Sequence, residues 1–212
     1  EQIPSAFLTI ISGAFRGEAA LGGFAGASLL QAWRIGIARG IFTNEAGLGS
    51  ASIAHAAAKT AHPSRQGMWG VLEVFIDTHI ICTITALVLI TTGAWQTGLD
   101  GAAMTIWAFN RGLPGATGQY IVTVGLIFFA FSTLLAWSYY GEKCACFILG
   151  EGFAGTYRLL WILFVFVGSL GGLKLIWGLA DILNGLMAIP NLVGLVALSG
   201  ITARLTKEYF SA

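Results

Sequence analysis

The stretch GQYIVTVGLIFFAFSTLLAWSYY, residues 118–140, contains no charged side chain. A helix rises about 1.5 Å per residue, so a helix of this length can cross a hydrocarbon core of about 30 Å. In lipid every backbone polar group must be satisfied within the protein, and a single segment achieves this as an α-helix. The stretch therefore predicts a membrane-spanning helix.

The whole chain has the composition of a membrane protein. Of its 212 residues, 56% are hydrophobic and 10% are charged, and the mean hydropathy is +0.79. Soluble domains average about 25% charged residues. A second long apolar run extends from Val71 to Trp95 and holds Asp77 and His79. We expect an all-α, multi-pass protein of the cell membrane that contacts the lipid bilayer.

Charge and cysteine usage argue against two other classes of protein. The net charge is +1, and the Lys and Arg residues are spread out, without the basic run that a nucleic-acid-binding surface needs. Cys144 and Cys146 lack the further ligands of a zinc site, and Cys82 stands alone. We expect no nucleic-acid partner and no cofactor.

Glycine, proline and polar clusters divide the chain into its spans. An apolar helix is expected first, over residues 3–15. The expected spans are residues 17–42 with a break at 22–26, residues 67–95, residues 118–147 and residues 156–172. Residues 173–206 follow as one kinked helix or two short ones, because Pro190 removes a backbone donor.

The distribution of basic residues predicts the orientation in the membrane. In and beside the hairpin 43–66, basic side chains outnumber the one acid, Glu45; they are Arg34, Arg39, Lys59 and Arg65. The loop 96–117, in which we expect a short central helix, has only Arg111 as a basic residue. Cytoplasmic loops carry an excess of Lys and Arg. The hairpin is therefore expected in the cytoplasm and the loop outside.

Residues 22–26, GGFAG, are dense in glycine. Glycine weakens a helix, and unwound backbone at membrane depth is tolerated only where it lines a cavity or is buried in protein. Its N–H and C=O groups then become ligands for carboxylates and cations. The alternative is close helix packing through small residues.

Ser132, Thr133 and Trp137 are expected to share a helix face with Phe129, because they follow it by three, four and eight residues. Two hydroxyls can offer hard oxygen ligands to a small cation. The Trp137 ring is large enough to form the floor of a pocket. The alternative is that the hydroxyls bond to carbonyls one turn earlier. Asp77, an ionisable group inside a span, is expected to couple an ion or a proton, or to bond a neighbouring helix.

The segment NEAGLGSASIAHAAAK, residues 44–59, joins the first two spans. It predicts a short helix capped by Ser50, with Asn44 and Glu45 satisfying backbone groups at the end of the preceding helix. As a nucleophile and a base, Ser50 and His55 also suggest an intramembrane hydrolase as an alternative. A nucleophile and its base must meet beside an oxyanion hole, and a cytoplasmic hairpin offers no dry site.

Several long motifs together resemble one known family. They are GGFAG, GIARGIFTNEAGLGSASIAHAAAKTAHPSRQG, FIDT, FAFSTLLAWSYYGEK and DILNGLMAIPNL, and the resemblance runs over nearly all 212 residues. They strongly resemble the sodium:alanine (alanine/glycine:cation) symporter family, whose architecture is similar to the leucine-transporter fold of two inverted five-helix repeats. The resemblance implies that this chain is the C-terminal half, beginning at the broken sixth helix.

The resemblance also implies the site residues. The amino-acid substrate would contact Gly22, Gly23, Phe24 and Trp137. Ser132 and Thr133 would complete a sodium site with the missing N-terminal half, and Asp77 would contribute to a second ion site.

The implied function is sodium-coupled symport of a small neutral amino acid, alanine or glycine, by alternating access, and not an enzymatic reaction. The hairpin 43–66 would then be a gate region that moves during transport. Besides the hydrolase, the remaining alternative is a helical channel or structural subunit that does not transport.

Overall fold

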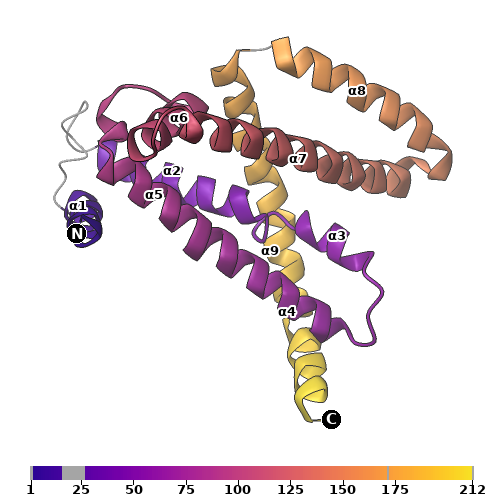
Figure 1. The fold of residues 1–212 in the computed structure, drawn as a ribbon. Coiled ribbons are helices and arrows are strands. Elements are labelled where there is room, and N and C mark those ends of the chain that lie inside the picture. The colour runs from indigo at the N-terminus through magenta and orange to yellow at the C-terminus, as the bar shows by residue number, and fades with distance from the viewer. Residues whose placement is uncertain (1, 16–26, 171, 212) are drawn as a thin grey trace. The chain divides into compact units, whose positions relative to one another are not determined.

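The computed structural model describes residues 2–15, 27–170 and 172–211. Over these residues the chain is helical and contains no strand (Figure 1). The prediction of an all-α protein is thus confirmed for the described part of the chain. The expected break at 22–26, with Gly22, Gly23 and Phe24, lies outside the described residues.

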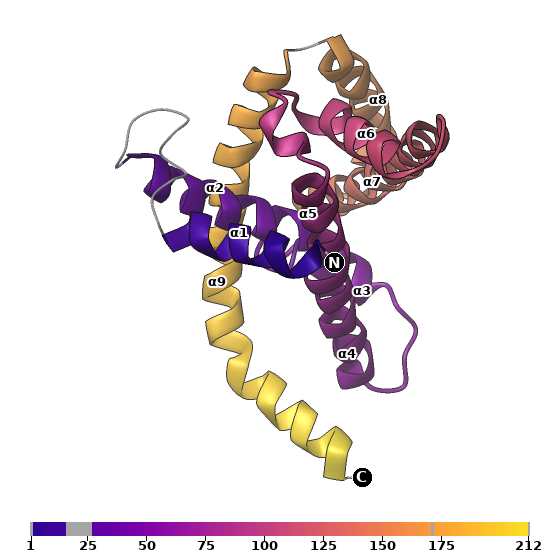
Figure 2. The ribbon, with the colours of Figure 1, turned by 60° about the vertical axis from the view of Figure 1, so that its left-hand side comes forward.

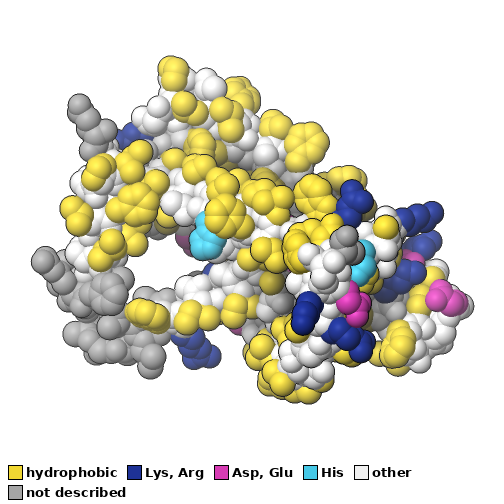
Figure 3. Space-filling view, turned by 90° about the horizontal axis from the view of Figure 1, so that it is seen from below, with side chains coloured by type: hydrophobic (Ala, Val, Ile, Leu, Met, Phe, Trp, Pro, Cys, Tyr) yellow, Lys and Arg dark blue, Asp and Glu magenta, His cyan; other side chains and the backbone are white. Residues whose placement is uncertain are grey.

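Four helical runs are long and apolar enough to cross a membrane. They are Pro63–Thr91, Thr117–Leu149, Glu151–Leu170 and Leu175–Ser211, and their mean hydropathies are 2.0, 2.0, 1.6 and 1.8. In each run the most apolar window has none of its residues buried inside the structure. Hydrophobic side chains accordingly cover much of the face in Figure 3. Large exposed apolar surfaces mark contacts with a membrane or another protein, and here they confirm a multi-pass integral membrane protein.

The chain forms two units. The first comprises Glu1–Gly40 and Phe75–Phe131, and the second comprises Ile41–Val74 and Ser132–Ala212. Continuous helices pass from one unit into the other, among them α2 (Ala27–Asn44) and α7 (Thr117–Leu149). Each unit is described on its own below.

In the first unit, α5 is the element against which the others pack. Both α1 and α6 contact α5, and Figure 2 shows α1 beside it. Ala94 and Ala108 are completely buried. The short helix expected within loop 96–117 is confirmed as α6. The elements of this unit are α1 (Ile3–Phe15), the π-helix η2 (Phe75–Ile81), α5 (Cys82–Thr91), the 3-10 helix η3 (Ala94–Gln96), α6 (Gly101–Gly112) and the first part of α7.

In the second unit, α4 and the C-terminal part of α9 lie side by side. The His62 ring, just before α4, lies 5.1 Å from the Tyr209 ring near the end of α9. Helix α9 is continuous, with Pro190 inside it. The elements of this unit are α3 (Ala51–Ala56), α4 (Pro63–Val74), the second part of α7, the 3-10 helix η4 (Glu151–Phe153), α8 (Ala154–Leu170) and α9 (Leu173–Ser211).

The end of α7 is joined to the beginning of α8 by a paired charge. The guanidinium of Arg158 donates to both carboxylate oxygens of Glu142, at 2.6 and 2.8 Å. Beside this pair, Gly141 lies against the Tyr157 hydroxyl so closely that a Cβ would overlap it. Two-point guanidinium–carboxylate pairs fix geometry as well as adding energy, so this contact sets how α8 leaves the end of α7.

Candidate functional site

Trp137 lies on α7 in the second unit, within a cluster of aromatic rings. Its ring centroid is 6.4 Å from that of Phe42 at the end of α2 and 6.0 Å from that of Tyr140, one turn further along α7. Phe42 in turn meets Trp177 of α9 edge to face at 5.9 Å. Aromatic pairs of this kind contribute about 0.5–1.5 kcal/mol each beyond their buried area. The cluster therefore joins α2, α7 and α9.

The indole N–H of Trp137 donates to Oε1 of Glu45 at 2.9 Å. The other carboxylate oxygen, Oε2, accepts from the Ser50 hydroxyl at 2.9 Å. We call these three residues, Glu45, Ser50 and Trp137, the Glu45 junction. Hydrogen bonds to an ionised carboxylate are stronger than neutral ones, so the junction fixes the Trp137 ring against the hairpin.

Glu45 has an unusual backbone for its residue type. Its φ is +56°, and among the described residues it is the only non-glycine with a positive φ. It directly follows Asn44, the last residue of α2, at a position where helices commonly end on Gly or Asn. A left-handed residue other than glycine costs about 1–2 kcal/mol. Such conformations persist where the surroundings over-determine them, and they cluster at functional sites.

The rest of this loop is held by α9. The Asn191 side-chain amide donates to the carbonyl oxygen of Gly47 at 3.0 Å and to that of Ala46 at 3.4 Å. Gly49 has a φ of +81°, and a Cβ there would come within 2.6 Å of the Asn191 Oδ1 atom. The loop 43–50 is thus bound by side chains of two helices, α7 and α9.

Ser132 and Thr133 lie on α7 one turn before Trp137, and both side chains are exposed. Thr133 and Trp137 are four residues apart and share a helix face. The described part of the second unit thus brings the predicted hydroxyl pair and the predicted pocket residue onto one stretch of helix.

Asp77 belongs to the first unit and is half-buried in the π-helix η2, Phe75–Ile81. The rings of Phe75 and His79 lie 5.2 Å apart on this segment. Short π-helical segments are rare and occur frequently at functional sites. Periodicity in the sequence gives no sign of a π-helix, so this feature of Asp77 was not predicted.

One prediction for the residues around Ser50 is wrong, and the hydrolase alternative loses its support. The Ser50 hydroxyl makes no capping bond to α3, because the Ser50 backbone is itself helical, with φ −66° and ψ −44°, whereas a capping residue typically has an extended backbone. The hydroxyl donates to Glu45. The nitrogen atoms of His55 face Gln66 Nε2 at 2.8 Å and Glu73 Oε2 at 3.3 Å. Ser50 and His55 therefore lack the nucleophile–base contact that a hydrolase requires. In contrast, Asn44 Oδ1 does accept from the Ala46 backbone N–H at 3.1 Å, as expected.

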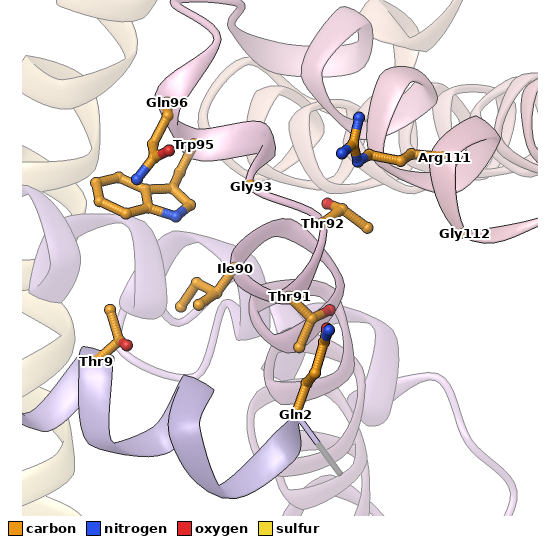
Figure 4. Close-up of a pocket in the computed structure, with 10 residues that line it drawn as sticks. All are labelled: Gln2, Thr9, Ile90, Thr91, Thr92, Gly93, Trp95, Gln96, Arg111 and Gly112. Atoms are coloured by element: carbon orange, nitrogen blue, oxygen red, sulfur yellow. The ribbon is translucent and has the colours of Figure 1, made fainter.

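A separate pocket of about 650 Å³ lies in the first unit, at the end of α5 (Figure 4). The labelled side chains around it include Gln2, Trp95 and Arg111. The hydroxyls of Thr91 and Thr92 line it as well, but each donates to a carbonyl of its own helix. Among the described residues, the predicted site residues Asp77, Ser132, Thr133 and Trp137 do not line this pocket. Across the described ranges, no three His, Cys, Asp or Glu side chains come together as a metal site.

Comparison with known proteins identifies the chain's relatives. The model of the sodium:alanine symporter family matches residues 1–212. The chain belongs to the sodium:alanine symporter family. This confirms the resemblance of its motifs and assigns the chain to a family of membrane transporters rather than enzymes.

Named members of the family are similar over nearly all of the chain. An uncharacterized transporter of Haemophilus influenzae is 50% identical over 99% of the chain and 46% of its own length. The sodium/alanine symporter AgcS of Methanococcus maripaludis is 48% identical over 96% of the chain and 45% of its own length. The probable sodium/glutamine symporter GlnT of Bacillus subtilis is 35% identical over 98% of the chain and 43% of its own length.

The chain spans about half the length of these members of the sodium:alanine symporter family. No solved structure matches it. The arrangement of inverted repeats expected from the family resemblance therefore stays a prediction.

Proposed function

We propose that this chain is part of a symporter that uses an inward sodium gradient to import a small neutral amino acid, alanine or glycine. The observation that carries the proposal is the 48% identity with a relative named as a sodium/alanine symporter, over 96% of the chain. A second relative is named as a probable sodium/glutamine symporter. Coupling to sodium is common to both names, whereas the amino acid differs.

The substrate would contact the glycine-rich segment and the Trp137 ring. Unwound backbone at Gly22, Gly23 and Phe24 would offer N–H groups to the substrate carboxylate. The Trp137 ring would close the pocket from α7 and limit the size of the side chain that fits. The fixed orientation of this ring in the Glu45 junction supports that role.

Sodium would bind at Ser132 and Thr133. Small hard cations prefer oxygen ligands, and two neighbouring hydroxyls on one helix offer them without a full negative charge. The exposure of both side chains leaves them accessible to carbonyl oxygens of another segment. The remaining ligands would come from an N-terminal half of the transporter, as would part of the substrate site.

Asp77 is proposed as a ligand of a second coupling ion. A carboxylate within a membrane span is costly and marks ion or proton pathways. Its place in a π-helical turn supports a role beyond packing, because such turns are frequent at functional sites.

The proposed mechanism is alternating access, with the hairpin 43–66 on the cytoplasmic side. The packing of α4 against the end of α9 supports this orientation. The basic residues of the hairpin favour the cytoplasm, and Arg204 and Lys207 near the end of α9 favour the same side. Two segments on one side of a membrane can meet in this way, whereas segments on opposite sides cannot.

The test is uptake of labelled alanine by the complete transporter in proteoliposomes, with and without a sodium gradient. We expect uptake only with the gradient, and Thr133→Ala should raise the sodium concentration for half-maximal uptake by about tenfold, the cost of one lost charge-assisted contact. The matched control is Thr85→Ala, whose hydroxyl donates to Ile81 of its own helix at 2.9 Å. Uptake that ignores sodium, or an equal shift in both variants, would contradict the proposal.

A further inference from the structure

We propose that Glu45 is a positioning residue for transport: its carboxylate holds the indole of Trp137 and thereby ties the end of α2 to the helix that carries Ser132 and Thr133. This inference rests on the proposed function. It gives a role to a residue that is otherwise only the acidic member of a basic hairpin.

The carboxylate of Glu45 contacts two different segments. Its two oxygens accept from different segments, Oε1 from Trp137 on α7 and Oε2 from Ser50 in the loop, each at 2.9 Å. Ser50 is only 2% exposed, so water cannot readily replace Glu45 as its partner. A buried donor left without an acceptor costs about 1–3 kcal/mol. Glu45 therefore holds two segments in one geometry, and neither can move without breaking a bond.

The Trp137 ring is fixed on two sides. Its N–H is bound by Glu45, and Phe42 of α2 packs on the ring at 6.4 Å. Phe42 and Glu45 are three residues apart at the end of α2, so both contacts report the position of the same helix end. A displacement of that end would turn or shift Trp137, and with it the stretch of α7 one turn from Thr133.

The backbone of Glu45 also indicates a role for its side chain. A glycine or asparagine would adopt the φ of +56° at lower cost. The strained position is nevertheless occupied by a residue whose side chain reaches the indole of Trp137, 92 residues away in the sequence. The side chain, rather than the backbone, explains a glutamate here.

The substrate site proposed above begins on the N-terminal side of α2, and the proposed sodium ligands lie on α7. A rigid joint between the far end of α2 and α7 would transmit a change at one site to the other. The coupling would then be reciprocal, since a linkage between two binding sites acts equally in both directions.

The test is a double-mutant cycle in the complete, reconstituted transporter. Glu45→Met removes both acceptor oxygens while keeping the length of the side chain, and Trp137→Phe removes the indole N–H. Each single variant should raise the apparent KM for alanine and the sodium half-saturation by about tenfold, since each breaks the same charge-assisted bond. The double variant should stay near tenfold, because residues in one bond are not additive.

Two further variants separate the carboxylate from other effects. Glu45→Gln keeps an acceptor for the indole and can donate to the Ser50 hydroxyl, so it should restore the wild-type values to within about threefold. Glu45→Gly relieves the backbone but removes the side chain, so it should behave like Glu45→Met. The control is Glu208→Met, which removes an exposed carboxylate that lies 3.9 Å from Arg204 and should change neither value.

The outcomes are distinct. A double variant near a hundredfold, or a Glu45→Gly variant with wild-type values, overturns the inference while the proposed function stands. Wild-type protein without sodium-dependent alanine uptake overturns the proposed function and the inference with it. Near-tenfold effects in both single variants and in the double variant, with recovery in Glu45→Gln, support the inference.

Discussion

The loop 43–50 and the hydroxyl pair Ser132–Thr133 lie in the same unit, yet they differ in almost every physical respect. The loop is held by hydrogen bonds from α7 and α9, and its Ser50 is only 2% exposed. The hydroxyl pair, one turn from Trp137, is exposed. We interpret the loop as a fixed joint and the hydroxyl pair as ligands for an ion. Stability and ion binding should therefore respond to different substitutions.

The largest effect is expected at Gly49. Gly49→Ala would place a Cβ within 2.6 Å of Asn191 Oδ1 in a backbone with a φ of +81°. The strained backbone and the overlap together should lower the free energy of unfolding by about 3 kcal/mol. Chemical denaturation in detergent measures this. Gly185→Ala in α9, whose added Cβ would meet nothing within 4 Å, is the control and should be neutral or stabilising. Equal effects at both glycines would contradict the interpretation of the loop as a fixed joint.

An intermediate effect is expected at Asn191. Asn191→Ala removes the amide that donates to the carbonyls of Ala46 and Gly47, and should lower the free energy of unfolding by about 1–2 kcal/mol. Asn191→Asp should lower it further, because a carboxylate cannot donate and repels these carbonyl oxygens. The same denaturation measurement tests both variants. A less destabilised Asp variant would show that the Asn191 bonds do not hold the loop.

The smallest effect on stability is expected at Thr133. Thr133→Val keeps the shape of an exposed side chain and removes only the hydroxyl, so the free energy of unfolding should change by less than about 0.5 kcal/mol. The sodium half-saturation should nevertheless rise, as for Thr133→Ala. The two measurements on one purified variant separate an effect on sodium binding from an effect on stability. A large loss of stability would mean that the hydroxyl serves the fold.

The fold class could be predicted from the sequence because long apolar runs identify membrane-spanning helices. Residues 118–140 lack charge, and the helical run around them, Thr117–Leu149, is long enough to span the bilayer. The turn after α2 was also partly predicted, since Asn44 Oδ1 accepts from the Ala46 backbone N–H. Both features depend on residues that are close together in the sequence, so the sequence alone is enough to predict them.

The junction could not be predicted, because its partners are remote. Ser50 was expected to cap α3, but its backbone is helical, and its hydroxyl donates to a carboxylate five residues earlier. Glu45 was expected to bond backbone groups, whereas its side chain meets Trp137, 92 residues away. The single acid in a basic hairpin was the one available signal. The predicted roles of Ser132, Thr133, Trp137 and Asp77 stay predictions, and Gly22, Gly23 and Phe24 lie outside the described residues.

Sodium coupling is tested most directly by the entry of radiolabelled sodium into proteoliposomes that hold the complete transporter, with and without external alanine. We expect alanine to accelerate sodium entry, and Thr133→Ala to require about tenfold more sodium for the same acceleration. Sodium entry at one rate with or without alanine would contradict it and would favour a channel.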